Sequence, residues 1–143
     1  MRVNKVDHIS IAVRNLDEAC KRWEPVLGKS EPDDVYVDES EEIRVARYWV
    51  GEIGFELMES TTPDGEVAKF INKRGEGVML ISFNVDNTRD AAKELQKAGY
   101  PFIPDKREEI VRPFRDCEFA FMHPKKMNGV LTEIIDYNWN ELC

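Results

Sequence analysis

The chain has 143 residues, of which 42% are hydrophobic and 34% are charged, a balance typical of one soluble domain with a sizeable core. Its formal net charge of −8 argues against binding to a nucleic-acid backbone, which requires clustered cations. No apolar run approaches the length that spans a bilayer, and the opening MRVNKVDHIS lacks the apolar core of a signal peptide. We therefore expect neither a nucleic-acid nor a membrane partner.

The cysteines indicate the compartment. Cys20, Cys117 and Cys143 are an odd number, and they lack the spacing of a metal site. The plain interpretation is reduced thiols in a cytoplasmic protein.

The first half of the chain predicts a strand, a helix and three further strands. Apolar alternation predicts a strand over residues 3–13. The segment NLDEACKRWEPVLG predicts a helix, with Asn15 as its N-cap, acidic residues in its first turn and Gly28 after its end. The remaining strands are expected at about residues 33–39, 42–50 and 52–59.

The second half repeats this order after a connecting segment. TPDGEVAKFINKRGEG predicts a turn, a short helix and a glycine-rich exit. A strand is expected over 78–85 and a helix from Asn87 to Gly99. Shorter strands are expected at roughly 101–103, 115–122 and 129–136.

The two halves also match residue by residue. VDHISIAVRNLDEA (6–19) corresponds to VMLISFNVDNTRDAA (78–92), which makes His8 equivalent to Leu80. GFELMES (54–60) and LTEIIDY (131–137) make Glu56 equivalent to Glu133. Such a repeat predicts two units that pack as one domain, because each is too small to bury its sheet alone. The expected organisation is a single domain, 1–143, with module one at about 3–60, a connecting segment at 61–77 and module two at about 78–138.

Strand periodicity indicates where His8 points. Successive side chains alternate between faces, so His8 shares a face with small or polar neighbours, which suits the wall of a cavity. The opposite face is apolar and is expected to pack beneath the helix. The cavity faces are expected to carry His8, Ser10 and Ala12 in the first strand and Leu80, Ser82 and Asn84 in the second; the core faces carry Asp7, Ile9, Ile11 and Val13, and Ile81, Phe83 and Val85.

Glu56 and Glu133 raise a question of charge. Both lie inside otherwise apolar strands, and an unpaired buried carboxylate is costly. A metal ion, or pairing with a cation such as Arg44, would relieve that cost. The plainer alternatives are a structural histidine at His8 and solvent-facing positions for the two glutamates.

Four motifs carry a resemblance to a known family. The chain resembles the vicinal oxygen chelate (glyoxalase and bleomycin-resistance) superfamily and, within it, most closely the methylmalonyl-CoA epimerase family. The motifs span nearly the whole chain, and the last two are the more specific to the epimerases. They are VDHISIAVRNLDEA (6–19), VLGK (26–29), AKFINKRGEG (68–77) and HPKKMNGVLTEIIDY (123–137).

The resemblance implies an α+β fold of two βαβββ modules, whose curved mixed sheet encloses a cleft that holds a divalent metal (Co, Mn, Mg, Ni or Zn). Carried over by position, its four ligand positions are His8, Glu56, Leu80 and Glu133. Leu80 cannot bind a metal, so the implied metal ligands are His8, Glu56 and Glu133. The epimerase family normally begins its second module with two histidines, where this chain has Met79 and Leu80.

The resemblance also implies a reaction, the removal and return of an α-proton beside an acyl-CoA thioester. A divalent cation would stabilise the enolate, and a carboxylate would act as base. An ungapped alignment places Arg44 where the family has a glutamate base, and a slip of two residues brings Glu42 there. The candidate catalytic residues are Glu56, Glu42 and Arg44; the candidate substrate-binding residues are Arg44, Leu80, Lys69 and Arg74.

Three functions stay open at this point. The first is a metal-assisted epimerase of a methylmalonyl-CoA-like thioester. The second is another enzyme of the superfamily, for example one like lactoylglutathione lyase. The third is a catalytically silent small-molecule-binding protein that has lost the metal. In each case we expect a small-molecule ligand and, from the resemblance, a homodimer.

Overall fold

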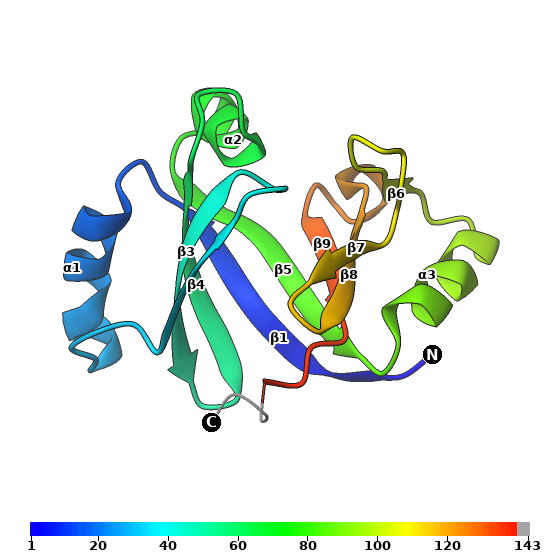
Figure 1. The fold of residues 1–143 in the computed structure, drawn as a ribbon, viewed down its shortest axis with the longest axis horizontal. Helices are drawn as coiled ribbons and strands as arrows, with labels where there is room; N and C mark the ends of the chain where they lie inside the picture. The colour runs from blue at the N-terminus through cyan, green and yellow to red at the C-terminus, as the bar shows by residue number, and fades with distance from the viewer. Residues whose placement is uncertain (140–143) are drawn as a thin grey trace. The chain divides into compact units, whose positions relative to one another are not determined.

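Strands and helices follow one another in the predicted order (Figure 1). The structure is a computed structural model that describes residues 1–139. Its helices are α1 (Leu16–Leu27), α2 (Glu66–Arg74), α3 (Thr88–Lys97) and the short 3₁₀ helix η1 (Pro124–Lys126). Its strands are β1 (Val3–Ala12), β2 (Asp34–Asp38), β3 (Ile43–Val50), β4 (Ile53–Ser60), β5 (Gly77–Val85), β6 (Phe102–Ile103), β7 (Arg112–Phe114), β8 (Cys117–Met122) and β9 (Leu131–Ile135). The α+β class is confirmed, and none of the helices within residues 1–139 is long and apolar enough to cross a membrane.

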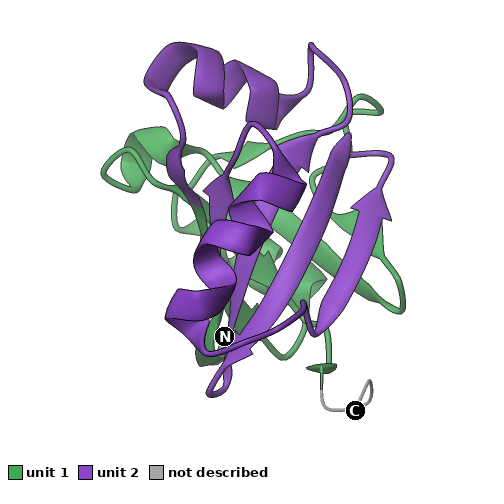
Figure 2. Ribbon diagram, turned by 90° about the vertical axis from the view of Figure 1, so that its left-hand side faces the viewer, with its two compact units in different colours: residues 1–7, 80–143 green, residues 8–79 purple. Residues whose placement is uncertain are grey.

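The chain divides into two compact units (Figure 2). Unit 2 comprises residues 8–79, and unit 1 comprises residues 1–7 together with the chain from Leu80 onward. The boundaries fall inside β1 and β5, so each of these two strands contributes to both units.

Unit 2 is a four-stranded mixed sheet in the order β2-β3-β4-β1. β1 runs parallel to β4, whereas β2–β3 and β3–β4 are antiparallel. Apolar side chains pack on both faces of this sheet. The cluster with α1 contains Val13, Leu16, Ala19, Ala46, Tyr48 and Leu57, and the cluster with α2 contains Ala12, Val45, Met58, Val67 and Ile71.

The α2 cluster modifies one prediction about β1. His8, Ser10 and Ala12 share a face, as predicted, but Ala12 is fully buried in the α2 cluster. The face therefore changes character along the strand: it is polar at His8 and Ser10, and it is core where α2 covers it.

Unit 1 has the sheet order β5-β9-β8-β6, and β7 pairs with β8. β5 and β9 are parallel, and the other pairs are antiparallel. The core beside α3 contains Val85, Ala91, Ala92, Phe102, Ala120, Met122 and Ile134.

The β7–β8 hairpin is one strand more than predicted in this half. The pair Phe114 and Cys117 closes a two-residue turn, in which Arg115 has a left-handed backbone (φ 51). Glycine or asparagine usually marks such a turn, and their absence here explains why the sequence predicted a strand starting at residue 115.

The register of the two parallel pairs reproduces the internal repeat. Ser10 lies opposite Glu56 in the β1–β4 pair, and Ser82 lies opposite Glu133 in the β5–β9 pair. The predicted equivalence of the two glutamates therefore holds at the level of individual strand partners.

Candidate functional site

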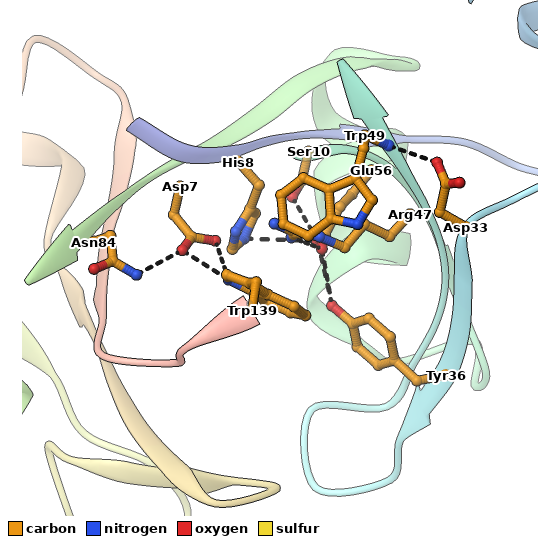
Figure 3. Close-up of polar contacts among 10 residues, drawn as sticks. All are labelled: Asp7, His8, Ser10, Asp33, Tyr36, Arg47, Trp49, Glu56, Asn84 and Trp139. Carbon is orange, nitrogen blue, oxygen red and sulfur yellow. Dashed lines mark hydrogen bonds and ion pairs between the residues drawn. The ribbon is translucent and has the colours of Figure 1, made fainter. Parts of the chain in front are cut away.

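A buried carboxylate, Glu56, is the centre of a polar cluster in unit 2 (Figure 3). Its side chain comes from β4 and is only 1% exposed. Arg47 Nη1 donates to Oε2 at 2.6 Å, and the Tyr36 hydroxyl lies 3.2 Å from the same oxygen. Ser10 Oγ donates to Oε1 at 3.3 Å. We call these four residues together with His8 the Glu56 cluster.

His8 completes the cluster from β1. Its imidazole Nε2 lies 3.6 Å from Glu56 Oε1, and the residue is buried. In the β1–β4 register His8 is the strand partner of Gly54, two positions before Glu56. The structure thus brings together two of the three predicted metal ligands, His8 and Glu56.

Arg47 supplies the positive charge of the cluster. It is fully buried, at 0% exposure. Its guanidinium lies 4.4 Å from the centroid of the Trp49 ring, and it occupies the space that a side chain at Gly54 would need. A buried charge requires a partner of opposite sign, so Arg47 and Glu56 depend on each other.

Hairpin register explains why these two residues meet. The β3–β4 hairpin turns at Gly51 and Glu52, with Val50 paired to Ile53. Counting back along both strands from that turn pairs Arg47 with Glu56. Sequence reasoning missed Arg47, although the VGEI turn held the signal that would have found it.

Arg44 lies on the opposite face of β3. Its guanidinium contacts Asp17 at 3.2 Å and Glu59 at 3.5 Å, and its side chain is 39% exposed. The three-residue separation from Arg47 places the two side chains on different faces of the strand. The structure does not bring Arg44 together with Glu56.

Glu42 lies outside β3, in the turn that leads into it, where its backbone has φ 58. It precedes Arg47 by five residues, which is roughly 16 Å along an extended chain. The predicted base Glu42 therefore lies outside the strand that carries Arg47, and its catalytic role stays a prediction.

The two predicted cations of the connecting segment lie on α2. Lys69 is exposed, and its Nζ lies 3.5 Å from Glu66 Oε1. The Arg74 guanidinium lies 5.7 Å from the centroid of the Phe70 ring. Lys69 lies in the first half of this helix and Arg74 is its last residue. Cationic side chains of this kind can bind an anionic group through charge-assisted hydrogen bonds.

The remaining two predicted positions belong to unit 1. Leu80 is buried in β5 opposite Leu131. Glu133 is buried in β9, with Ser82 as its partner on one side and Phe121 on the other. Burial raises the pKa of the nearby Cys117 thiol, and the carboxylates of Asp136 and Glu133 raise it further.

Unit 1 has a buried polar group that the sequence did not predict. Asp7 accepts from Trp139 Nε1 at 2.8 Å and from Asn84 Nδ2 at 2.9 Å (Figure 3). Asp7 was predicted on the apolar face of its strand, and it is fully buried. Its two donors explain how a carboxylate is accommodated there, since buried polar groups require hydrogen bonds.

The arrangement around Glu56 does not fit the predicted metal site as it stands. One oxygen of this carboxylate is bound to a guanidinium, and hydroxyl groups approach both oxygens. Among residues 1–139, no three His, Cys, Asp or Glu side chains form a group able to hold a metal ion. The ligand set of His8, Glu56 and Glu133 therefore stays a prediction.

Comparison with known proteins assigns the family. The model of the glyoxalase/bleomycin resistance protein/dioxygenase superfamily matches residues 7–121. This match covers most of the chain, and the chain belongs to that superfamily. The resemblance inferred from the motifs is confirmed.

Two curated relatives and one solved structure are similar over most of the chain. An uncharacterized protein of Bacillus subtilis (strain 168), YqjC, is 29% identical over 94% of this chain and 93% of its own. The mitochondrial methylmalonyl-CoA epimerase of Homo sapiens is 29% identical over 92% of this chain and 73% of its own. A methylmalonyl-CoA epimerase in complex with methylmalonyl-CoA and NH4+ is 28% identical, with a TM-score of 0.84 over 94% of this chain and 95% of its own.

Proposed function

We propose that this protein is an isomerase that epimerises a 2-carboxyacyl-CoA thioester of the methylmalonyl-CoA type. The similarity to methylmalonyl-CoA epimerases along nearly the whole chain carries the proposal, with a TM-score of 0.84 to one of them. A variant of the Streptomyces coelicolor epimerase in complex with 2-nitronate-propionyl-CoA, at 28% identity, supports the same ligand class.

The Glu56 cluster is the proposed chemical centre. Epimerisation needs a group that removes the α-proton and a group that returns it. His8 and Glu56 are the two side chains of the cluster that accept protons, and they are adjacent, with 3.6 Å between Nε2 and Oε1. Arg47, Tyr36 and Ser10 hold the carboxylate in place, as a preorganised site requires.

The cations of α2 are the proposed contact for the CoA phosphates. Lys69 and Arg74 lie on one short helix, and Lys73 adds a third positive charge in its last turn. Lysine and arginine bind phosphate through charge-assisted hydrogen bonds. Substitution of these residues should therefore raise KM for a CoA thioester more than it lowers kcat.

The alternative of a silent binding protein has one specific observation in its favour. Leu80 stands where the family resemblance implies a ligand, and it is buried opposite another leucine. A protein of this kind would bind the thioester and leave its α-proton in place.

Exchange of the α-proton separates the two functions. Methylmalonyl-CoA is incubated with the protein in D2O, and its α-proton signal is followed by NMR above the rate without protein. An epimerase replaces this proton with deuterium, and we expect Arg89→Met, which alters an exposed ion pair in unit 1, to do so at the parent rate.

Two further substrates and a binding measurement with methylmalonyl-CoA complete the test. Propionyl-CoA lacks the 2-carboxylate and should exchange far more slowly. Binding of methylmalonyl-CoA without exchange would replace the proposal with the silent binder. Turnover of the methylglyoxal–glutathione hemithioacetal, with no effect on the CoA thioester, would instead favour an enzyme like lactoylglutathione lyase.

A further inference from the structure

We infer that Arg47 is a built-in cation that holds Glu56 and prevents this carboxylate from binding a divalent metal ion. The inference concerns the site of the proposed function and goes beyond it, because it assigns the source of the positive charge. Metal binding tests the role of Arg47, whereas turnover tests the proposed epimerase activity, so either proposal can fail without the other.

The contacts of Glu56 are the first step. Arg47 Nη1 lies 2.6 Å from Oε2, which is a short, charge-assisted hydrogen bond. Both residues are at most 1% exposed, so water screens this pair very little. A metal ion on the same carboxylate would lie within a few ångströms of a guanidinium that cannot lose its charge.

The surroundings of Arg47 are the second step, because they are built for a guanidinium. A side chain at residue 54 would collide with its terminal atoms, and glycine leaves that space open. The Trp49 ring covers the guanidinium at 4.4 Å. The backbone N–H of Trp49 donates to Asp33 at 2.8 Å, which anchors this end of β3 (Figure 3).

The internal repeat supplies a third, independent step. Arg47 is the strand partner of Glu56 in unit 2, and Phe121 is the strand partner of Glu133 at the equivalent place in unit 1. An arginine is therefore the strand partner of the glutamate in unit 2 and not in unit 1, where the buried Arg112 lies over the Phe121 ring at 4.8 Å. Arg47 stands beside Glu56, the predicted carboxylate ligand whose Oε1 lies 3.6 Å from His8 Nε2.

Titration with Co²⁺ tests the inference, by calorimetry and by the visible absorption of the bound ion. We expect no binding to the parent protein. Arg47→Met, which removes the charge and keeps a long side chain, should bind Co²⁺ with a Kd at least about tenfold below the highest concentration at which the parent shows no binding, since removal of a nearby like charge favours the cation. Arg44→Met is the matched control, because it removes an arginine from the same strand on the opposite face, and it should behave like the parent.

Each outcome decides the question. Stoichiometric Co²⁺ in the parent, lost in His8→Ala, would overturn the inference. The inference would also be overturned if Arg47→Met folds and still does not bind Co²⁺. If Arg47→Met does not fold, the Co²⁺ titration is made with Arg47→Gln, since glutamine keeps an N–H donor for Glu56 and removes the charge. Folding of either variant only when Co²⁺ is present would count as gained binding.

Discussion

Glu56 and Arg47 form a buried ion pair in unit 2, with 2.6 Å between Arg47 Nη1 and Glu56 Oε2. Replacing one partner of a buried ion pair leaves the other charge without compensation. Exposed pairs contribute little, because water screens them and long side chains lose freedom. β4 carries one glutamate of each kind, three positions apart. Glu56 pairs with the buried Arg47, and Glu59 pairs with the partly exposed Arg44.

Glu56→Gln should therefore lower the free energy of unfolding by about 3–5 kcal/mol, the cost of breaking a buried pair. Glu59→Gln weakens the half-exposed contact with Arg44 and keeps an amide oxygen that can accept the Leu16 N–H. It should lower the free energy of unfolding by less than about 1 kcal/mol. Urea unfolding at neutral pH measures both. Equal losses in the two variants would contradict the assignment of Arg47 and Glu56 as the buried pair.

Gly54→Ala should act through Arg47. Its new methyl group would meet the guanidinium, and overpacking of a filled interior typically costs about 1–3 kcal/mol. The loss should be smaller in the Arg47→Met background, where the obstructing group is absent. A double-mutant cycle by urea unfolding gives this coupling, and additive effects would show that Gly54 has another role.

Sequence reasoning reached part of this site. Strand periodicity pointed to His8 and the repeat pointed to Glu56, and the family resemblance placed both in one ligand set. Arg44 was predicted from an ungapped count from His8, and Arg47 was not considered, because such a count ignores which face of a strand a residue occupies. The hairpin register of β3 and β4 decides that question, and a register depends on turn geometry as well as on composition.

At the scale of elements, the helix starts were predicted from one residue each. Asn15 caps α1 by accepting from the Glu18 N–H at 3.0 Å, and Asn87 caps α3 by accepting from the Asp90 N–H at 2.9 Å. α1 is also tied to the sheet, because the Leu16 N–H donates to Glu59. Local signals of this kind are readable from sequence because donor and acceptor lie within three residues.

Removal of either cap should cost about 1 kcal/mol of unfolding free energy. Asn15→Ala and Asn87→Ala test this in parallel, and the matched variants Asn15→Ser and Asn87→Ser keep an acceptor oxygen. Thermal and urea unfolding should place the serine variants close to the parent. Alanine and serine variants of equal stability would argue that the caps do not stabilise these helices.

Strand pairing was predicted less completely than the helices were. The order of elements and the equivalence of Glu56 with Glu133 follow from the repeat. The β7–β8 hairpin and the burial of Asp7 do not, because they depend on a turn without glycine and on a tryptophan 132 residues away. A contact between residues as far apart in sequence as Asp7 and Trp139 leaves no local signal.

At the scale of the whole molecule, the two halves share an architecture and differ in charge. Unit 2 holds a compensated Glu56 beside His8, and unit 1 holds Leu80 at the position equivalent to His8. Membership of the superfamily therefore does not by itself provide the predicted metal site, since fold does not determine chemistry.

The proposed reaction and the proposed role of Arg47 together predict that α-proton exchange proceeds with Arg47 in place and without a divalent metal. The most direct measurement is the rate of exchange of methylmalonyl-CoA in D2O before and after exhaustive removal of metal ions by a chelator. We predict the same rate in both samples. Loss of exchange after chelation, with recovery on addition of Co²⁺ or Mn²⁺, would contradict the claim.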